Sequence, residues 1–247
     1  MIVYVNGCSY ASISDGKRYS EYLAEHFNCD SVNAAIPGSC NSRILRTSLR
    51  DLINLKKQHK DIVAIISLSF VLRTEVWNRD PNRQDRWKQS GDGDFISMQF
   101  TGAHDWKKKL DKGHVDWKIS GTQLRNYGKS WLIWYDVESE ITKLLQQIIL
   151  FTAWCKSNAI KCVLFSGPLQ ESIDFESPFV KPFYDVVQED TSVIDIFNKS
   201  FTEWCKLAGH TPIDKFTMQI HGNSYACGHH GAAAHRDWAK FLIENYL

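Results

Sequence analysis

A serine near the beginning of the chain and a histidine near its end are the first candidates for reactive side chains. Ser9 lies in the segment NGCSY at residues 6–10, directly after an apolar run that predicts a first strand. His229 lies in the segment GHHG at residues 228–231, directly before the last helical pattern. A serine hydroxyl is a poor nucleophile at neutral pH unless a base within hydrogen-bonding reach takes its proton. The pair therefore predicts nucleophilic catalysis by Ser9, with His229 as the base.

The elements between these two residues alternate in a way that could bring them together. Strands are expected over residues 2–6, 31–35, 61–69 and 161–166, and helices over residues 17–27, 41–59, 135–157, 191–207 and 232–247. The run DIVAIISLS at residues 61–69 is nearly all apolar, which is typical of a parallel strand buried on both faces. The alternation predicts a three-layer α/β/α sandwich with a parallel sheet of about five strands. Right-handed crossovers would place the strand-to-helix loops along one edge, where ligands bind.

Between residues 77 and 128 this rhythm stops. The segment is dense in Asp, Arg, Lys, Gly and Trp and has no sustained period. Because Trp87, Trp106 and Trp117 need to be buried, we interpret it as a lid-like insertion in a single domain of residues 1–247, rather than as a disordered linker. Basic residues interleaved with aromatic ones can bind nucleic acid. Aspartates are mixed among them here, which favours a solvated lid.

Composition limits the classes of protein that need to be considered. The chain has 247 residues, 43% of them hydrophobic, and a formal net charge of +1, which predicts neither a nucleic-acid surface nor an acidic tail. Its seven cysteines contain no Cys-x-x-Cys pair and suit free thiols in a reducing compartment. No apolar run approaches the roughly 20 residues that span a bilayer, and Met1 leads directly into a strand. We expect a cytoplasmic protein without membrane or nucleic-acid partners, and the oligomeric state stays open.

Three short motifs follow one another along the chain: GCS at residues 7–9, AIPGSCN at residues 35–41 and HHGAAAHRDWA at residues 229–239. In order and spacing they resemble three blocks of the SGNH, or GDSL-like, hydrolase superfamily, in a divergent form of the sort often seen in phage genomes. The resemblance implies an SGNH/flavodoxin-like α/β/α fold and a serine esterase that works through an acyl-Ser9 intermediate with His229 as base. It implies no cofactor and no metal, and a small-molecule or glycan ester as substrate.

The resemblance also implies an oxyanion hole. In the family, the backbone N–H groups of the serine and of the second-block glycine hold the oxyanion, together with an asparagine side chain from a third block. The first two correspond to Ser9 and Gly38, and preorganised donors of this kind contribute about 3–4 kcal/mol each. Where the third block would lie, this chain reads SLSF at residues 67–70, without asparagine. Asn41, which shares a turn with Gly38, is the nearest substitute. The alternative is that Asn41 caps the following helix, and one residue can do both.

A second departure concerns the acid that orients the histidine. The family places an aspartate two or three residues before it, where this chain has Ala226 and Cys227. Either a backbone carbonyl holds His229, or an acid arrives from elsewhere, with Asp214 as a candidate, or the hydrolase chemistry has been lost. Loss of the acid of a triad costs about 10⁴-fold in turnover. Two rivals to the esterase therefore stay open: an acyltransferase that uses the same acyl-enzyme, and a non-catalytic binding protein on this fold.

Arg73 and Glu75 follow the third expected strand and would lie at the same edge. An arginine there could bind a carboxylate or phosphate of the substrate through two parallel hydrogen bonds. The alternative is a structural ion pair of Glu75 with Arg73 or Arg43. Cys8 is expected to pack beneath the turn that carries Ser9, because cysteine is among the most buried residue types.

The last motif and the residue pair before it also contain a group of potential metal ligands: Cys227, His229, His230 and His235. Their spacing matches no usual zinc finger, and the rings of two adjacent histidines would point apart. We therefore predict no metal site. His235 is expected to be a helix-face histidine that stacks or forms hydrogen bonds with its surroundings.

Overall fold

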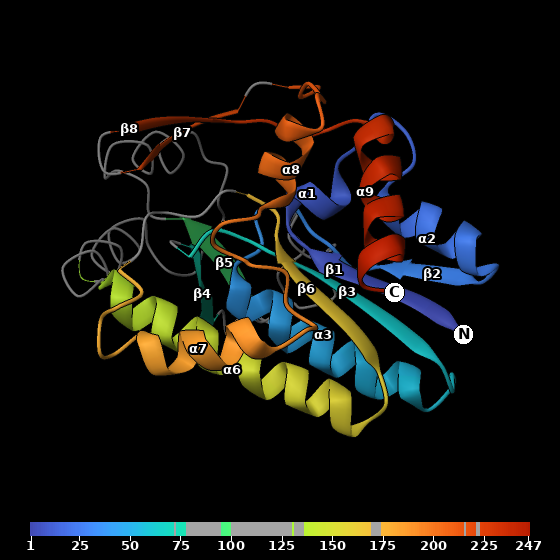
Figure 1. Cartoon of the computed structure of the whole chain (residues 1–247), viewed down its shortest axis with the longest axis horizontal. Coiled ribbons are helices and arrows are strands. Elements are labelled where there is room, and N and C mark those ends of the chain that lie inside the picture. Colours follow the sequence, from blue (N-terminus) through green and yellow to red (C-terminus); the bar gives the residue numbers. More distant parts are fainter. Residues whose placement is uncertain are drawn as a thin grey trace.

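In the computed structural model, a four-stranded sheet forms the centre of the molecule (Figure 1). The structure describes residues 1–71, 73–77, 95–99, 130, 136–168, 174–214, 216–220 and 223–247. All three strand pairings are parallel, in the order β2-β1-β3-β6. The strands are β1 (Ile2–Gly7), β2 (Asp30–Asn33), β3 (Ile62–Leu68) and β6 (Lys161–Ser166). The predicted α/β class is confirmed.

The sheet of about five strands that the sequence predicts is four strands wide in the described part of the chain. A single further bridge lies beside β6, where two backbone hydrogen bonds of 2.7 and 2.8 Å join Leu164 to the parallel segment 192–194. The predicted helix over residues 191–207 is therefore wrong in its first half. Helix α8 (Phe201–Leu207) begins only after Ser200, whose hydroxyl accepts a hydrogen bond from the first turn. A serine is a preferred N-cap, and the β-branched residues before it suit an extended segment.

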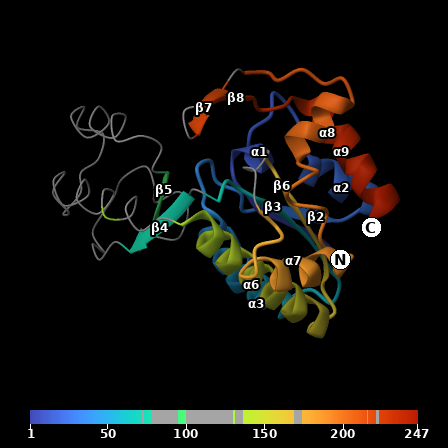
Figure 2. The ribbon, with the colours of Figure 1, turned by 60° about the vertical axis from the view of Figure 1, so that its left-hand side comes forward.

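Helices cover both faces of the sheet (Figures 1 and 2). On one side, α2 (Tyr19–Phe27) packs against α9 (Ala232–Asn245), which α8 also contacts. On the other side, α3 (Asn41–Lys56) packs against α6 (Val137–Ser157), and α6 packs against α7 (Lys181–Glu189). The short helix α1 (Ser9–Ser12) follows β1 directly. This is the expected three-layer arrangement.

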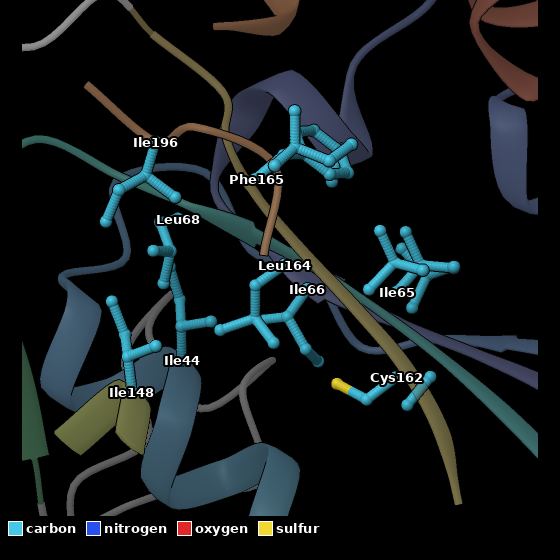
Figure 3. Close-up of a cluster of buried hydrophobic side chains, with 14 of the residues drawn as sticks. Ile44, Ile65, Ile66, Leu68, Ile148, Cys162, Leu164, Phe165 and Ile196 are labelled. Carbon is cyan, nitrogen blue, oxygen red and sulfur yellow. The ribbon is translucent and has the colours of Figure 1, made fainter. Parts of the chain in front are cut away.

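Apolar side chains fill the space between these layers. Every residue of β1 and β3 is buried, which explains why neither strand shows an alternating pattern in the sequence. Figure 3 shows Ile66 and Leu68 of β3 gathered with Ile44 of α3 and Ile148 of α6. Burying an aliphatic side chain of this size stabilises the fold by about 1.5–3 kcal/mol. The core thus forms a rigid platform beneath the carboxyl ends of the strands.

Two antiparallel hairpins lie outside the central sheet. One pairs β4 (Arg73–Trp77) with β5 (Phe95–Gln99), and the other pairs β7 (Phe216–Ile220) with β8 (Asn223–Cys227). Apart from Trp77 and β5, the predicted insertion of residues 77–128 lies outside the described residues, including its three tryptophans. None of the helices in the described ranges combines the length and the apolar content that a membrane crossing requires.

Candidate active site

Ser9 lies at the carboxyl end of the first strand, where the sequence placed it. β1 ends at Gly7, Cys8 is extended and fully buried as predicted, and Ser9 is the first residue of α1, with 8% of its surface exposed. A Cβ on Gly7 would lie 2.7 Å from the carbonyl oxygen of Ser67 in β3, so the close contact of the two strand ends requires glycine. This contact fixes the turn that presents the Ser9 hydroxyl.

The end of β1 is also tied to α3 by a buried asparagine. The Asn6 side chain donates to the hydroxyls of Thr47 and Ser48, both at 2.9 Å, and accepts from the backbone N–H of Gly7 at 2.8 Å. Buried polar groups require such partners, because an unsatisfied amide costs about 1–3 kcal/mol. The turn before Ser9 is therefore held on two sides, by β3 and by α3.

His229 is paired with Asp214, an acid that lies 15 residues earlier in the chain. The Nδ1 atom of His229 lies 2.7 Å from Oδ2 of Asp214, and the backbone N–H of His229 donates to Oδ1 at 2.7 Å. Of the three interpretations that the sequence left open, the structure thus supports an acid from elsewhere in the chain. With its Nδ1 proton donated to a carboxylate, a neutral imidazole keeps its Nε2 lone pair as a proton acceptor.

The close approach of the two segments depends on a glycine. The segment 212–214 lies antiparallel to residues 228–230, with a bridge between Pro212 and His230 and a 2.8 Å hydrogen bond from Ile213 N–H to the His229 carbonyl. A Cβ on Gly228 would lie only 2.2 Å from Cβ of Pro212 and 2.4 Å from the Asp214 carbonyl oxygen. Glycine at position 228 is therefore what lets Asp214 reach His229.

The charge of Asp214 is stabilised by the same contacts. Partial desolvation would raise the pKa of this carboxyl, but the hydrogen bonds from the His229 ring and backbone outweigh it and hold the pKa below its ordinary value. Asp214 is consequently ionised at neutral pH. A carboxylate in this position fixes the tautomer of the imidazole and stabilises the imidazolium that forms during proton transfer.

Three contacts join the segment after Ser9 to the segment around His229. The ring of Tyr10 lies against the His229 ring, with 5.3 Å between centroids. The Asp15 carboxylate accepts a hydrogen bond of 2.7 Å from the backbone N–H of Ala232, the first residue of α9. His235 lies 3.2 Å from the carbonyl oxygen of Ile13. The segments that carry the serine and the histidine therefore meet at one edge of the sheet, beside α1 and α9 (Figure 1).

The other two histidines of the last motif lie in apolar surroundings. His235 is fully buried and stacks on Tyr19, as expected of a helix-face histidine; its Nδ1 accepts from the Tyr19 backbone, so Nε2 carries the proton and donates to Ile13. His230 is 2% exposed, and neither of its ring nitrogens has a hydrogen-bond partner among the described residues. Burial lowers the pKa of each ring to about 4. The described residues contain no group of three potential metal ligands, and the side chain of Cys227 lies outside them.

Gly38 lies in the loop that runs beside the Ser9 turn. The backbone N–H of Ile36 donates to the Gly7 carbonyl at 3.1 Å, so Gly38 and Ser9 each lie two residues beyond a paired position. Gly38 has a φ of 83°, which favours glycine. The backbone N–H groups of Ser9 and Gly38 have no hydrogen-bond partner among the residues that the structure describes. Both are thus available as donors, as an oxyanion hole requires.

Asn41 bridges α3 and the end of β3. Its side-chain amide donates to the Ser69 carbonyl at 3.1 Å and its side-chain oxygen accepts from Ser69 N–H at 2.7 Å. The alternative of a helix cap is wrong, because Asn41 is the first residue of α3 and the cap is Cys40, whose sulfur accepts from the backbone of Arg43. A primary amide has two N–H groups, so a second donor is left for an oxyanion, and this role of Asn41 stays a prediction.

Arg73 and Glu75 lie in β4 and have different partners. Two hydrogen bonds of 2.8 and 3.3 Å join Glu75 to Arg46 of α3, a residue that neither sequence alternative included. This pairing favours a structural role for Glu75. Arg73 instead donates to the Ser69 hydroxyl at 2.7 Å and approaches the Ser39 carbonyl oxygen at 3.4 Å. Its guanidinium therefore lies where the loops after β2 and β3 meet.

Sequence reasoning missed several residues that build this edge. Tyr10 and Gly228 lie inside the two motif segments but were given no role, and Asp15 lies in no motif; their roles appear only when the two ends of the chain come together. Arg46 and Glu75 are 29 residues apart, so neither could signal the other. The one usable signal was the presence of a second acid, Asp214, not far before His229.

Comparison with known proteins adds little. No protein-family model and no curated protein sequence matches this chain. Among solved structures, it is similar to LAE5, described as an alpha/beta hydrolase enzyme from the metagenome of Lake Arreo, Spain. The alignment covers 99% of this chain and 94% of that chain, with 12% identity and a TM-score of 0.42. A likeness this distant carries no argument about function.

Proposed function

We propose that the protein is a serine esterase related to the SGNH hydrolases, with Ser9 as nucleophile, His229 as base and Asp214 as the acid that orients it. The observation that carries the proposal is the bidentate Asp214–His229 contact, formed at the same edge as Ser9. A histidine held in this way by a carboxylate is what activation of a serine requires. The sequence offered two arguments for a non-catalytic protein, the lack of an aspartate just before His229 and the lack of a third-block asparagine, and the Asp214–His229 contact weighs against the first of them.

In the first half of the reaction, Nε2 of His229 takes the proton of the Ser9 hydroxyl while Oγ attacks the ester carbonyl carbon. A C–O bond forms, and the carbonyl electron pair moves onto oxygen. The N–H groups of Ser9 and Gly38, with the Asn41 amide, hold this oxyanion. The intermediate then collapses, the bond to the leaving alkoxide breaks, and the imidazolium of His229 returns its proton to that oxygen.

In the second half, His229 takes a proton from water, and the hydroxide oxygen attacks the acyl-Ser9 carbonyl. Collapse of the second tetrahedral intermediate releases the carboxylic acid and returns the proton to Ser9 Oγ. No step needs a cofactor. If another alcohol replaces water in this half, the product is a transferred ester, and the enzyme is an acyltransferase.

A fluorophosphonate probe and 4-nitrophenyl acetate test the proposal together. The wild type should hydrolyse the ester and become labelled on Ser9, and Ser9→Ala should lose both, with turnover falling by about 10⁴-fold or more. Ser12→Ala, in the same short helix, is the matched control and should keep both. Product analysis with added alcohols separates hydrolysis from acyl transfer. Undiminished hydrolysis by Ser9→Ala, or no adduct on Ser9 between about pH 6 and pH 9, would overturn the mechanism.

A further inference from the structure

A pocket of about 300 Å³ lies between α7 and the extended segment that runs parallel to β6. Residues 192–194 of this segment bond to Leu164 of β6, so Asp195 follows at the carboxyl end of the segment. Ligands of open α/β sheets bind outside the carboxyl ends of parallel strands. The volume is at the lower limit for small-molecule sites, so the pocket suits a small ligand or a single side chain. Its lining consists of Tyr184, Val187 and Gln188 of α7 and of Val193, Asp195 and Ile196.

The apolar wall of this pocket is fixed by its own packing. The ring of Tyr184 stacks on Phe175, with 4.1 Å between centroids, and contacts Phe197 edge to face at 6.0 Å. Val187 is buried, and so is Ile196, which belongs to the core cluster of Figure 3. A wall that is already ordered loses little conformational freedom when a ligand binds.

The polar groups of the pocket are mostly acceptors. The Asp195 carboxylate accepts from the backbone N–H of Asn198 at 3.2 Å and from its side-chain amide at 3.0 Å, and it forms no ion pair with any residue that the structure describes. The Gln188 amide nitrogen donates to the Tyr184 hydroxyl at 2.5 Å. The Gln188 amide oxygen has no hydrogen-bond partner within the described ranges. A ligand that complements these groups must supply N–H donors and positive charge.

The surroundings of the pocket are negatively charged. Residues 174–199 contain six acidic and two basic residues, although the whole chain has a formal net charge of +1. Burial, and then the Asp195 charge, raises the pKa of Tyr184, so its hydroxyl stays neutral and the only charge in the lining is that of Asp195. A pocket with a negative charge and a negative rim attracts cations.

We propose that this pocket binds an organic cation, an ammonium or guanidinium group on a short apolar stem, with the Asp195 carboxylate as its counter-ion. The Tyr184 hydroxyl and the Gln188 amide oxygen accept further N–H groups of the cation. The stem lies against the Tyr184 ring and the side chains of Val187, Val193 and Ile196. The proposal involves neither Ser9 nor His229, so it stands or falls independently of the esterase function.

Calorimetric titration with probes that share a butyl stem tests the preference for a cation. The probes are butylammonium, butylguanidinium, butan-1-ol and butyrate. The two cations should bind saturably, and butan-1-ol should bind at least about 10-fold more weakly, because an ionised donor bonds more strongly to a carboxylate. Butyrate should not bind. Equal binding of butan-1-ol and the cations, or no saturable binding of either cation, would overturn the proposal.

Variants locate the cation. Asp195→Asn keeps an acceptor oxygen for Asn198 and should weaken cation binding by about 10-fold to 100-fold, without weakening that of butan-1-ol. Tyr184→Phe should weaken it by about 2-fold to 10-fold. Asp185→Asn is the matched control: it removes the same charge from α7 outside the pocket lining and should keep the wild-type affinity. Cation affinity that is unchanged in both Asp195→Asn and Tyr184→Phe would rule out this pocket as the site.

Capped amino acids distinguish the two sources of such a cation. Nα-acetyl-lysine amide and Nα-acetyl-arginine amide are titrated beside the butyl cations, in the wild type and in Asp195→Asn. Tighter binding of a capped amino acid identifies the basic side chain of a peptide as the ligand, whereas tighter binding of a butyl cation identifies a free small amine. Either result supports the proposal if the affinity depends on Asp195, and contradicts it if the affinity does not.

Discussion

The two ends of the segment 229–235 differ in what surrounds their histidine rings. His229 lies against a carboxylate, with 12% of its side chain exposed, whereas His235 is fully buried, stacked on Tyr19 and bonded only to backbone groups at both ring nitrogens. His230, next to His229, is also buried but has no partner among the described residues for either nitrogen. One residue type thus has three environments within seven positions. The neighbours decide which ring can act as a base, and only His229 has a carboxylate to balance a proton.

Replacing the Asp214 carboxylate should abolish this difference between His229 and the other two histidines. Among the changes around these rings, it should have the largest effect on activity. In Asp214→Asn the side-chain amide would donate to Nδ1, which moves the imidazole proton to Nε2 and removes the lone pair that accepts the Ser9 proton. We expect kcat for 4-nitrophenyl acetate to fall by about 10²–10⁴-fold, with KM and the unfolding midpoint little changed. Asp185→Asn on α7 is the matched control, because the one ion pair that Asp185 forms with a described residue is with Lys181 of the same helix. Equal activity of Asp214→Asn and wild type would remove Asp214 from the mechanism.

The burial of His230 should make the stability of the fold depend on pH. Burial first, and then the nearby His210 and His229, lowers the pKa of His230 from 6.5 to about 4. Between these values the unfolded chain binds a proton that the folded chain does not, so the free energy of unfolding rises with pH across the window from about 4 to 6.5. The contribution of His230 to stability, up to about 3 kcal/mol, is fully present above this window and is lost as the pH falls through it.

His230→Phe tests this directly by urea unfolding at pH 7 and pH 5. The ring has no hydrogen bond to lose in the described structure and contacts Phe201 edge to face, so phenylalanine should be tolerated at pH 7. The difference in unfolding free energy between the two pH values should shrink by about 1–2 kcal/mol. The exposed His26→Phe is the control and should keep the wild-type difference. A variant with an unchanged pH dependence would show that His230 titrates normally.

Comparison of the structure with the sequence-based predictions shows which parts of the fold and of the site can be predicted from the sequence. Continuous apolar runs predicted β1, β3 and β6, because a strand buried on both faces needs no polar side. Ser9 and His229 were placed at the sheet edge by the same reasoning. Their elements do meet there. The turn at Gly38 was also anticipated, and its positive φ explains the glycine.

What the sequence could not give depends on contacts between distant segments. Asp214 reaches His229 only because Gly228 leaves space for a short antiparallel pairing, and nothing local to either segment announces that pairing. The N-terminal half of the predicted helix at 191–207 failed because the edge of β6 recruits residues 192–194, an interaction that periodicity does not report. The pairing of Asp214 with His229 therefore depends on tertiary structure, and no local sequence motif predicts it.

The smallest expected effect concerns the contact between Asp15 and the first residue of α9, which lies between His229 and His235. Asp15 accepts the backbone N–H of Ala232 and so supplies an anion at the positive end of α9, between His229 and His235. Asp15→Ala should lower the unfolding free energy by about 0.5–2 kcal/mol. It should reduce kcat by less than about tenfold, because it loosens the segment 13–18 that follows α1 without touching the reacting atoms. Asp15→Asn keeps the acceptor oxygen and should recover most of the stability, whereas Asp30→Ala, at an exposed position of β2, should change neither quantity.

If Asp15→Asn were as unstable as Asp15→Ala, the charge rather than the hydrogen bond would hold α9 to the segment 13–18. If neither variant differed from wild type, the position of His229 relative to Ser9 would depend on the Tyr10 and Ile13 contacts alone.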